Sequence, residues 1–477
     1  MKYTKDKRDK KTKTRRRIKK KHVKTKKYKH GGELNQNTKN VIDTALTKRS
    51  ENLSKMLQVA CKDPDNCLAL GKYDEIIKTF FDNFQNFNYI ESQDKKRIGG
   101  ISANGFVIEV PFKKDNYTAY TVLKCAENAV SDNLFYEYCV GKLFINNYIN
   151  KFPCFVETYD LYVFNNVSSY DNIKRAVLSN TLSRYILKDN ISRVKPIQDS
   201  NLIELISNSC LKNKTLCLLL QHFDKFISIG DATSIIPDKI ENEFYTLLYQ
   251  AYFALCSLGD KYTHYDLHEE NMFIYKPFED EKYIIMRYHR GDKIFEFKSE
   301  FIVKIIDYGR NYFNNGDISS KTIIDDVCRQ TTCQSREKGK LVEDCGSTKG
   351  YHWIQGSAKT TTNPSNFDWI DPIKPNMSHD LLIVNNVSGN ILKQYKGSPI
   401  KQIEYKKDHG TPQNMTGTKE NITNIFNLRD ALEDIILEER PMETNQRYLQ
   451  SHWKAAAVMN IYDDGRDYTY EILPEGS

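Results

Sequence analysis

Two short polar motifs, each set beside apolar segments, constrain this chain more than any other feature. The first, His264–Asn271, reads HYDLHEEN, and the second is Asp307-Tyr308-Gly309. Three segments with helix or strand periodicity flank the motifs: 241–258, 272–275 and 301–306. An isolated His-x-Asp or Asp-x-Gly is common by chance, but this order of settings is specific. It predicts that the side-chain oxygens of Asp266, Asn271 and Asp307 converge at one site.

The two motifs resemble those of the protein kinase superfamily. There, H-R-D-L-x-x-x-N supplies a catalytic aspartate and a metal-binding asparagine, and D-F-G supplies a second metal ligand. This chain keeps the order and spacing of the first motif, while Tyr265 and Tyr308 replace the usual Arg and Phe. The wording of Lys304–Tyr312, KIIDYGRNY, is similar to divergent serine/threonine-type kinases of large DNA viruses. The resemblance covers roughly residues 98–440.

The resemblance implies an α+β fold with two lobes, a small antiparallel β-sheet N-lobe and a mainly helical C-lobe. It implies that Asp266 accepts the proton of a substrate hydroxyl, and that Asn271 and Asp307 hold Mg²⁺ against the phosphates of ATP. His264 is expected to have a structural role. His268 is a departure, because protein kinases usually carry Lys there, in contact with the γ-phosphate. With a His at this position, the motif is similar to that of small-molecule and atypical kinases.

The nucleotide-binding end is expected upstream of these motifs. Residues 100–107 align with G-x-G-x-x-G-x-V, a loop whose backbone amides approach phosphate oxygens closely. The positions concerned are Gly100, Ser102, Gly105 and Val107. Lys124 resembles the strand Lys that clamps the α- and β-phosphates. Glu137, on a predicted helix 13 residues later, is expected to pair with it, and Glu127 is the weaker alternative.

Two further positions follow from the order of the motifs. Gln221, His222 and Phe223 are expected to form the hinge that offers backbone groups to adenine, after Leu220 at the gatekeeper position. Asp380, in a Ser-His-Asp-Leu stretch, resembles the buried Asp that anchors the backbone of the catalytic loop.

The tail and the N-terminal extension follow from shifts in composition and periodicity, and the division into lobes is what the kinase resemblance implies. The predicted parts are a disordered basic tail at 1–31, a helical N-terminal extension at 32–97, an N-lobe at 98–221 with an insertion at about 165–214, a C-lobe at 222–440 with a long activation-like segment at 310–375, and a C-terminal extension at 441–477.

The net charge of +8 conceals a division of charge along the chain. Residues 1–30 contain 17 Lys or Arg and two Asp, whereas the remainder contains 53 basic and 60 acidic side chains. Such a basic block repels itself and cannot bury apolar surface, so we expect disorder. It indicates attraction to nucleic acid or to an anionic membrane, or nuclear import, and the alternative is a solubilising arm or one that docks onto acidic partners.

Other features bear on location. No apolar run approaches the ~20 residues that span a bilayer, and the N-terminus lacks the apolar core of a secretory signal. Eleven scattered cysteines fit reduced intracellular thiols better than a disulfide framework. We therefore expect an intracellular protein that is not secreted, and the sequence indicates no oligomeric state.

The preferred hypothesis is an ATP- and Mg²⁺-dependent phosphotransferase of protein-kinase type that acts on protein hydroxyls, with Ser or Thr preferred. One alternative is a small-molecule kinase of the aminoglycoside- or choline-kinase type, which His268 favours. Another is a non-catalytic pseudokinase scaffold with a nucleic-acid-binding basic arm.

Overall fold

The fold is described by a computed structural model, and every structural statement below concerns the residues it describes. These are 36–90, 95–102, 105–126, 134–194, 216–326, 334–337, 340–343, 373–387, 404–407, 411–414, 422–437 and 452–474. The chain divides into two compact units, 1–50 and 51–477. Of the first unit, the described part is the beginning of helix α1 (Gln36–Ala60). The predicted basic tail lies outside the described residues.

The part of the predicted N-terminal extension that belongs to the second unit contains two short helices, α2 (Pro64–Ala69) and α3 (Asp74–Phe80). Helix α2 begins at a proline, and the Asp63 carboxylate accepts the backbone N–H of Asn66, which satisfies one of the donors that a helix leaves open at its first turn. Apolar side chains from this region, including Phe81, are fully buried in the core of the adjacent sheet.

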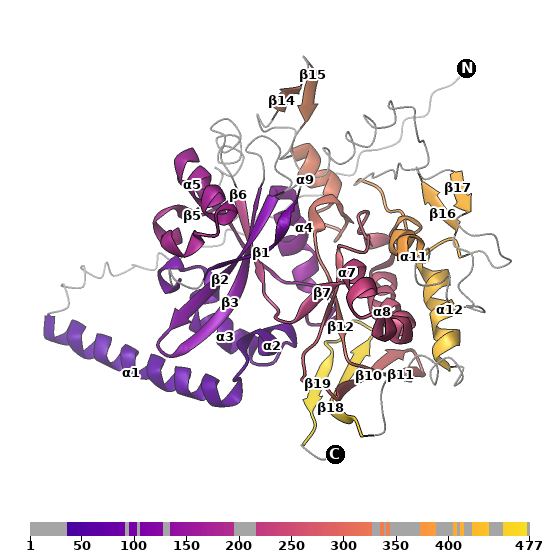
Figure 1. The fold of residues 1–477 in the computed structure, drawn as a ribbon, viewed down its shortest axis with the longest axis horizontal. Coiled ribbons are helices and arrows are strands. Elements are labelled where there is room, and N and C mark those ends of the chain that lie inside the picture. The colour runs from indigo at the N-terminus through magenta and orange to yellow at the C-terminus, as the bar shows by residue number, and fades with distance from the viewer. Residues whose placement is uncertain are drawn as a thin grey trace, which may run out of the picture. The chain divides into compact units, whose positions relative to one another are not determined.

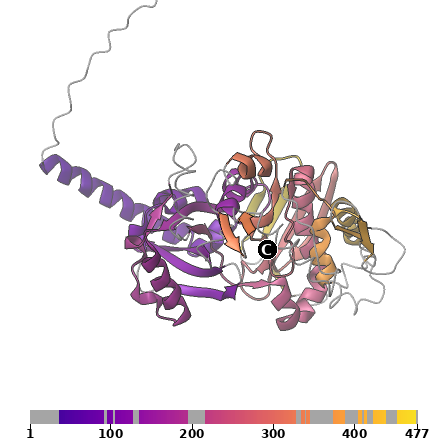
Figure 2. The same ribbon diagram turned by 90° about the horizontal axis from the view of Figure 1, so that it is seen from above.

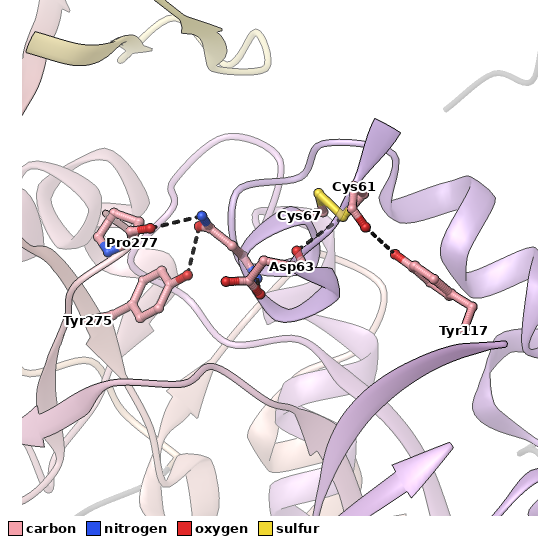
Figure 3. Close-up of a disulfide and its surroundings, with 7 residues drawn as sticks. Cys61, Asp63, Cys67, Tyr117, Tyr275 and Pro277 are labelled. Carbon is pink, nitrogen blue, oxygen red and sulfur yellow. Dashed lines mark hydrogen bonds between the residues drawn. A yellow bond between two sulfur atoms is a disulfide. The ribbon is translucent and has the colours of Figure 1, made fainter. Parts of the chain in front are cut away.

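A disulfide joins Cys61 to Cys67 and closes the loop that leads into α2 (Figure 3). The expectation of reduced thiols throughout was wrong for this pair, because two cysteines six residues apart meet where the chain turns between α1 and α2. The hydroxyl of Tyr117 donates to the carbonyl of Cys61 at 3.1 Å. The side chain of Asn66 donates to the carbonyl of Pro277 at 2.9 Å. The bridged loop therefore contacts both halves of the second unit.

The N-terminal sheet has six strands, all antiparallel, in the order β1-β2-β3-β6-β4-β5 (Figure 1). The strands are β1 (Lys96–Ser102), β2 (Gly105–Lys114), β3 (Tyr117–Ala126), β4 (Thr158–Phe164), β5 (Ile191–Arg193) and β6 (Leu216–Gln221). Helix α4 (Leu134–Leu143) contacts β4 and β6 of this sheet. The predicted insertion at about 165–214 contains helix α5 (Val167–Leu178) and β5, and its residues 195–214 lie outside the described part.

The C-terminal half is organised around helix α8 (Pro237–Leu258), whose residues Leu247, Leu248 and Ala251 are fully buried. Helix α12 (Ile425–Leu437) packs against it. Several shorter elements complete this half, and the two polar motifs lie in the loops between them. These elements are α7 (Ile229–Ile235), β7 (Phe226–Ser228), β8 (Tyr262–Thr263), β9 (Met272–Tyr275), β12 (Ile302–Ile305), β13 (Tyr312–Phe313), α9 (Ser320–Asp326) and α11 (Leu382–Val387). Figure 2 shows the N-terminal sheet and this helical half side by side.

A second sheet belongs to the C-terminal half, and sequence reasoning missed it. Its order is β11-β10-β18-β19, with β18 parallel to β10 and antiparallel to β19. The strands are β10 (Lys282–Arg290), β11 (Lys293–Ser299), β18 (Lys454–Tyr462) and β19 (Thr469–Ile472). The expected mainly helical C-lobe is therefore a mixed α+β structure, and the C-terminal extension supplies two strands of its sheet (Figure 1).

Two isolated hairpins complete the described elements. Strand β14 (Gln334–Glu337) pairs with β15 (Lys340–Glu343), and β16 (Glu404–Lys407) pairs with β17 (Thr411–Asn414). The first hairpin falls in the predicted activation-like segment at 310–375, of which 327–333, 338–339 and 344–372 lie outside the described residues.

Candidate functional site

A cavity of about 510 Å³ lies where the N-terminal sheet meets the C-terminal half. Its wall is mostly apolar, with a small number of polar groups at one end, a combination typical of small-molecule sites. The lining residues come from β1–β3, α4, β6, the segment after β6, α7 and the two motif loops. Lys124, Glu137 and Asp307 form its polar end.

These three side chains make a buried ion-paired cluster. The Nζ of Lys124 lies 2.7 Å from an Oε2 of Glu137 and 3.0 Å from an Oδ1 of Asp307. Burial alone would lower the pKa of Lys124, but the two carboxylates raise it above its ordinary value. Burial would likewise raise the pKa of Asp307, but the charge of Lys124 outweighs it and holds the pKa at about 2. The cluster is therefore charged at neutral pH and joins α4, β3 and the second motif.

The buried carboxylate of Asp380 holds the backbone of the first motif through hydrogen bonds. The backbone N–H groups of His264 and Tyr265 donate to its two carboxylate oxygens at 2.8 and 2.9 Å. Asp380 is buried, and burial raises its pKa to about 7 although the two backbone donors oppose the shift. The expected anchor is confirmed. It imposes a left-handed backbone on Tyr265, whose φ is 63°.

His264 has the structural role that was expected for it. Its Nε2 lies 2.9 Å from the carbonyl oxygen of Ile306, the residue before the second motif. The side chain is buried, and burial lowers its pKa to about 4, so the ring is neutral at physiological pH. This contact ties the two motif loops together.

The amide nitrogen of Asn271 faces the backbone of the first motif loop, to which Asn271 itself belongs. Its Nδ2 donates to the carbonyl oxygen of Asp266 at 2.8 Å, which leaves the amide oxygen available as a ligand. Asp307 has a left-handed backbone, with φ 66°, so the chain reverses here and its carboxylate faces the cavity. The next side chain, Tyr308, is buried, and its hydroxyl donates to the carbonyl of Ile305 at 2.9 Å.

Asp266 belongs to the first motif loop and is not among the residues that line the cavity. Burial raises the pKa of its carboxyl group above the ordinary value, although the charge of Arg310 opposes the shift. An Nη1 of Arg310 lies 3.4 Å from an Oδ1 of Asp266. The Nδ1 of His268 accepts the backbone N–H of Glu270 at 3.2 Å. The structure thus gathers the residues expected to be catalytic, while their roles remain predictions.

The residues expected to bind nucleotide divide into two groups. Gly105 and Val107 of β2 line the cavity, and Gly105 has φ 151°, a backbone conformation that favours glycine. Gly100 and Ser102 belong to β1, the other strand of the same hairpin. The tip of the hairpin, 103–104, lies outside the described residues.

The expected hinge residues Gln221 and Phe223 line the cavity, as does Leu220, but the side chain of His222 does not. The His222 ring is buried on the other side of the hinge, with Nδ1 3.0 Å from Asp65 and Nε2 3.3 Å from Glu109. Sequence reasoning could not find this arrangement, because Asp65 arrives from α2, about 150 residues earlier in the chain. The side chains of Ser228, Asp231 and Glu270 also line the cavity and were not foreseen.

His222 should make stability depend on pH. Burial would lower its pKa, but Asp65 and Glu109 raise it to about 9. Burial raises the pKa of Asp65, whereas contact with His222 lowers that of Glu109. Since the raised folded-state pKa favours protonation, the stabilisation is complete below pH ~6.5 and is lost as pH rises through about 9.

We therefore expect His222→Gln to destabilise the protein most at pH 6, with the difference from wild type shrinking by roughly 3 kcal/mol towards pH 9.5. Urea denaturation at pH 6, 7.5 and 9.5 measures it. His452→Gln is the matched control, because that imidazole is 53% exposed and contacts only Glu281 at 3.4 Å. A destabilisation that does not change with pH would contradict this assignment.

The donor set fits Mg²⁺. One carboxylate and one amide oxygen, from Asp307 and Asn271, are hard oxygen ligands, and Mg²⁺ in nucleotide sites takes one or two protein ligands and completes its shell with phosphate and water. Within the part of the chain that the structure describes, no group of three or more His, Cys, Asp or Glu is placed to hold a metal ion.

Comparisons with known proteins add little. No model of a known protein family and no curated protein matches the chain. Among solved structures, the chain has a weak structural similarity to the MAP kinase LmaMPK10 from Leishmania major, with a TM-score of 0.24 and 9% identity, over 77% of this chain and 98% of that one. A likeness at this level carries no argument about this chain. Nothing in these comparisons supports a viral relationship.

A search of the described helices for a bilayer-spanning segment found none of sufficient length and apolarity.

Proposed function

We propose that this protein is an ATP-dependent phosphotransferase of protein-kinase type that transfers the γ-phosphate to a protein hydroxyl. The observation that carries the proposal is the bridging position of Lys124, 2.7 Å from Glu137 and 3.0 Å from Asp307, at the polar end of an otherwise apolar cavity. A cation held in this way on a strand can bind the α- and β-phosphates while the apolar wall encloses the adenine.

The reaction needs little covalent participation from the protein. The acceptor oxygen attacks the γ-phosphorus, the bond between that phosphorus and the β–γ bridging oxygen breaks, and ADP leaves with the bond electrons. The hydroxyl proton passes to the carboxylate of Asp266. Partial burial, which raises the pKa of Asp266, improves it as a proton acceptor. Positioning and charge neutralisation supply most of the rate.

Asn271 and Asp307 are the residues that would hold Mg²⁺. The ion, when bound, neutralises phosphate charge and orients the triphosphate. The protein contributes a carboxylate whose pKa of about 2 keeps it ionised, and an amide whose nitrogen is already engaged by the Asp266 carbonyl. Both groups are therefore oriented before the nucleotide binds.

A protein acceptor, Ser or Thr in particular, is the first choice, and a small hydroxyl compound is the second. His268 favours the second, because its Nδ1 is engaged by the Glu270 backbone and the ring cannot imitate a lysine ammonium. A pseudokinase scaffold is the non-catalytic alternative. The +15 charge of residues 1–30 supports a role for that segment in binding nucleic acid or an acidic partner.

The test is nucleotide binding followed by transfer. We expect 1 mM ATP with Mg²⁺ to raise the melting temperature by roughly 1–3 °C, which corresponds to about 1.4–2.7 kcal/mol for a ligand at ~10–100 times its Kd. EDTA should reduce this shift. Radiolabelled phosphate should then pass to a generic protein acceptor or to the chain itself.

Parallel assays with protein and small hydroxyl acceptors separate the two enzymatic proposals. Transfer only to an aminoglycoside or choline would favour the small-molecule reading. No thermal shift and no transfer at millimolar ATP would leave the scaffold as the better account.

A further inference from the structure

The charges around the cavity do not balance at the end where transfer takes place. Three carboxylates, Glu137, Asp266 and Asp307, lie in this region, and Lys124 is engaged by two of them. ATP brings further negative charge, and the γ-phosphate is the group that gains contacts as the reaction proceeds. Mg²⁺ and Lys124 would each neutralise part of this charge, and a further cation near Asp266 would bring the total closer to balance.

His268 stands where protein kinases usually carry a lysine, and one of its two ring nitrogens is already used. Its Nδ1 accepts the backbone N–H of Glu270 at 3.2 Å, so Nε2 is the ring nitrogen left to face a phosphate oxygen. One ring nitrogen offers less than the three donors of a lysine ammonium.

Arg310 lies beside Asp266 and binds it weakly. Its side chain is 21% exposed, and its ion pair among the described residues is the Nη1 contact with Asp266 at 3.4 Å, longer than the ~2.7–2.9 Å of a strong charge-assisted bond. A guanidinium has five N–H donors, so most of its hydrogen-bonding capacity remains for another anion. Its charge also acts on Asp307, whose pKa it helps to lower, which places it near both motif carboxylates.

We propose that Arg310 binds the γ-phosphate of the nucleotide, exchanging its long contact with Asp266 for a bidentate contact with phosphate oxygens. The planar guanidinium suits such an anion better than any other side chain. The exchange also frees the Asp266 carboxylate for the acceptor hydroxyl. This inference rests on the proposed phosphotransferase function and names a further substrate-binding residue for it.

The binding test compares ATP with ADP, which lacks the γ-phosphate. By calorimetry with Mg²⁺, we expect Arg310→Ala to weaken ATP binding ~10-fold while leaving ADP binding within about twofold. Arg310→Lys should recover part of the loss. Equal weakening of both nucleotides would overturn the proposal, because it would indicate a general disturbance of the cavity.

The kinetic test removes the guanidinium of Arg310 and then places an ammonium group at position 268. Arg310→Ala should lower the rate of phosphate transfer ~10²-fold or more, on the scale of one lost electrostatic contact to a transition state. Adding His268→Lys to Arg310→Ala should restore at least ~10-fold, because the lysine ammonium then supplies the charge. Arg287→Ala is the matched control and should leave transfer unchanged, since that side chain pairs with Glu296 on the distant β10–β11 hairpin.

The outcomes separate this inference from the proposed function. If wild type transfers phosphate and Arg310→Ala transfers it equally fast or faster, the role of Arg310 is overturned and the proposed function is not. An increase would indicate that the contact with Asp266 is inhibitory. Absence of transfer by wild type, with an ATP-over-ADP preference that still depends on Arg310, would overturn the enzyme assignment and support the phosphate contact.

Discussion

Asp307→Asn should lower phosphate transfer by at least ~10³-fold while the protein remains folded. The substitution keeps the shape of the side chain but removes the charge that pairs with Lys124 at 3.0 Å and that would bind Mg²⁺. Loss of metal-based charge stabilisation amounts to several kcal/mol, and each 1.36 kcal/mol is a tenfold change in rate. Radiolabelled transfer to a generic acceptor, measured across a range of Mg²⁺ concentrations, gives the result.

The matched control for this variant is Asp317→Asn, an exposed carboxylate ten residues later in the chain. It should transfer phosphate at the wild-type rate. Circular dichroism of Asp307→Asn should be unchanged, because Lys124 keeps its ion pair with Glu137. If Asp307→Asn and wild type label the acceptor equally, the proposed metal ligand is wrong.

Asp380→Ala should be the most destabilising of the substitutions considered, with a loss of roughly 2–5 kcal/mol in the free energy of unfolding. It removes both acceptors of the backbone N–H groups of His264 and Tyr265, and each buried donor left without a partner costs about 1–3 kcal/mol. Asp380→Asn should lose less, because its one amide oxygen can still accept one of the two N–H groups. Urea denaturation measures both variants.

The same variants should reduce transfer, because the backbone that carries Asp266 is held through these two bonds. Asp464→Ala is the control: that carboxylate is 49% exposed and pairs with Arg466, so we expect no measurable change in stability. Equal stability of Asp380→Ala and wild type would show that the catalytic loop does not depend on this anchor.

Sequence reasoning worked where the spacing of chemically distinctive residues is local. The 13-residue interval between Lys124 and Glu137 joins a strand and the following helix, and the structure brings their charges to 2.7 Å. The same was true of the helix that precedes the first motif and of the strands β9 and β12 around the two motifs, because apolar periodicity decides such elements over short stretches.

It failed where partners are far apart in the chain. Nothing near His222 indicates that Asp65 will reach it, and nothing near β10 indicates that β18 will lie beside it. Residues 282–299 have an alternating pattern that is typical of strands, with burial at Ile284, Met286 and Tyr288. The kinase resemblance nevertheless predicted a mainly helical structure for this half. The disulfide was missed because eleven scattered cysteines suggested no pairing.

The place of β18 has a consequence for synthesis. This strand lies between β10 and β19, and its parallel register with β10 joins positions such as Met286 and Met459 across more than 170 residues of intervening chain. A ribosome delivers β10 long before it delivers its neighbour. At about 5–20 residues per second, the edge of β10 waits roughly 10–35 seconds before β18 emerges. During that interval one edge of β10 has no neighbouring strand, and chaperones or another nascent chain can bind to it.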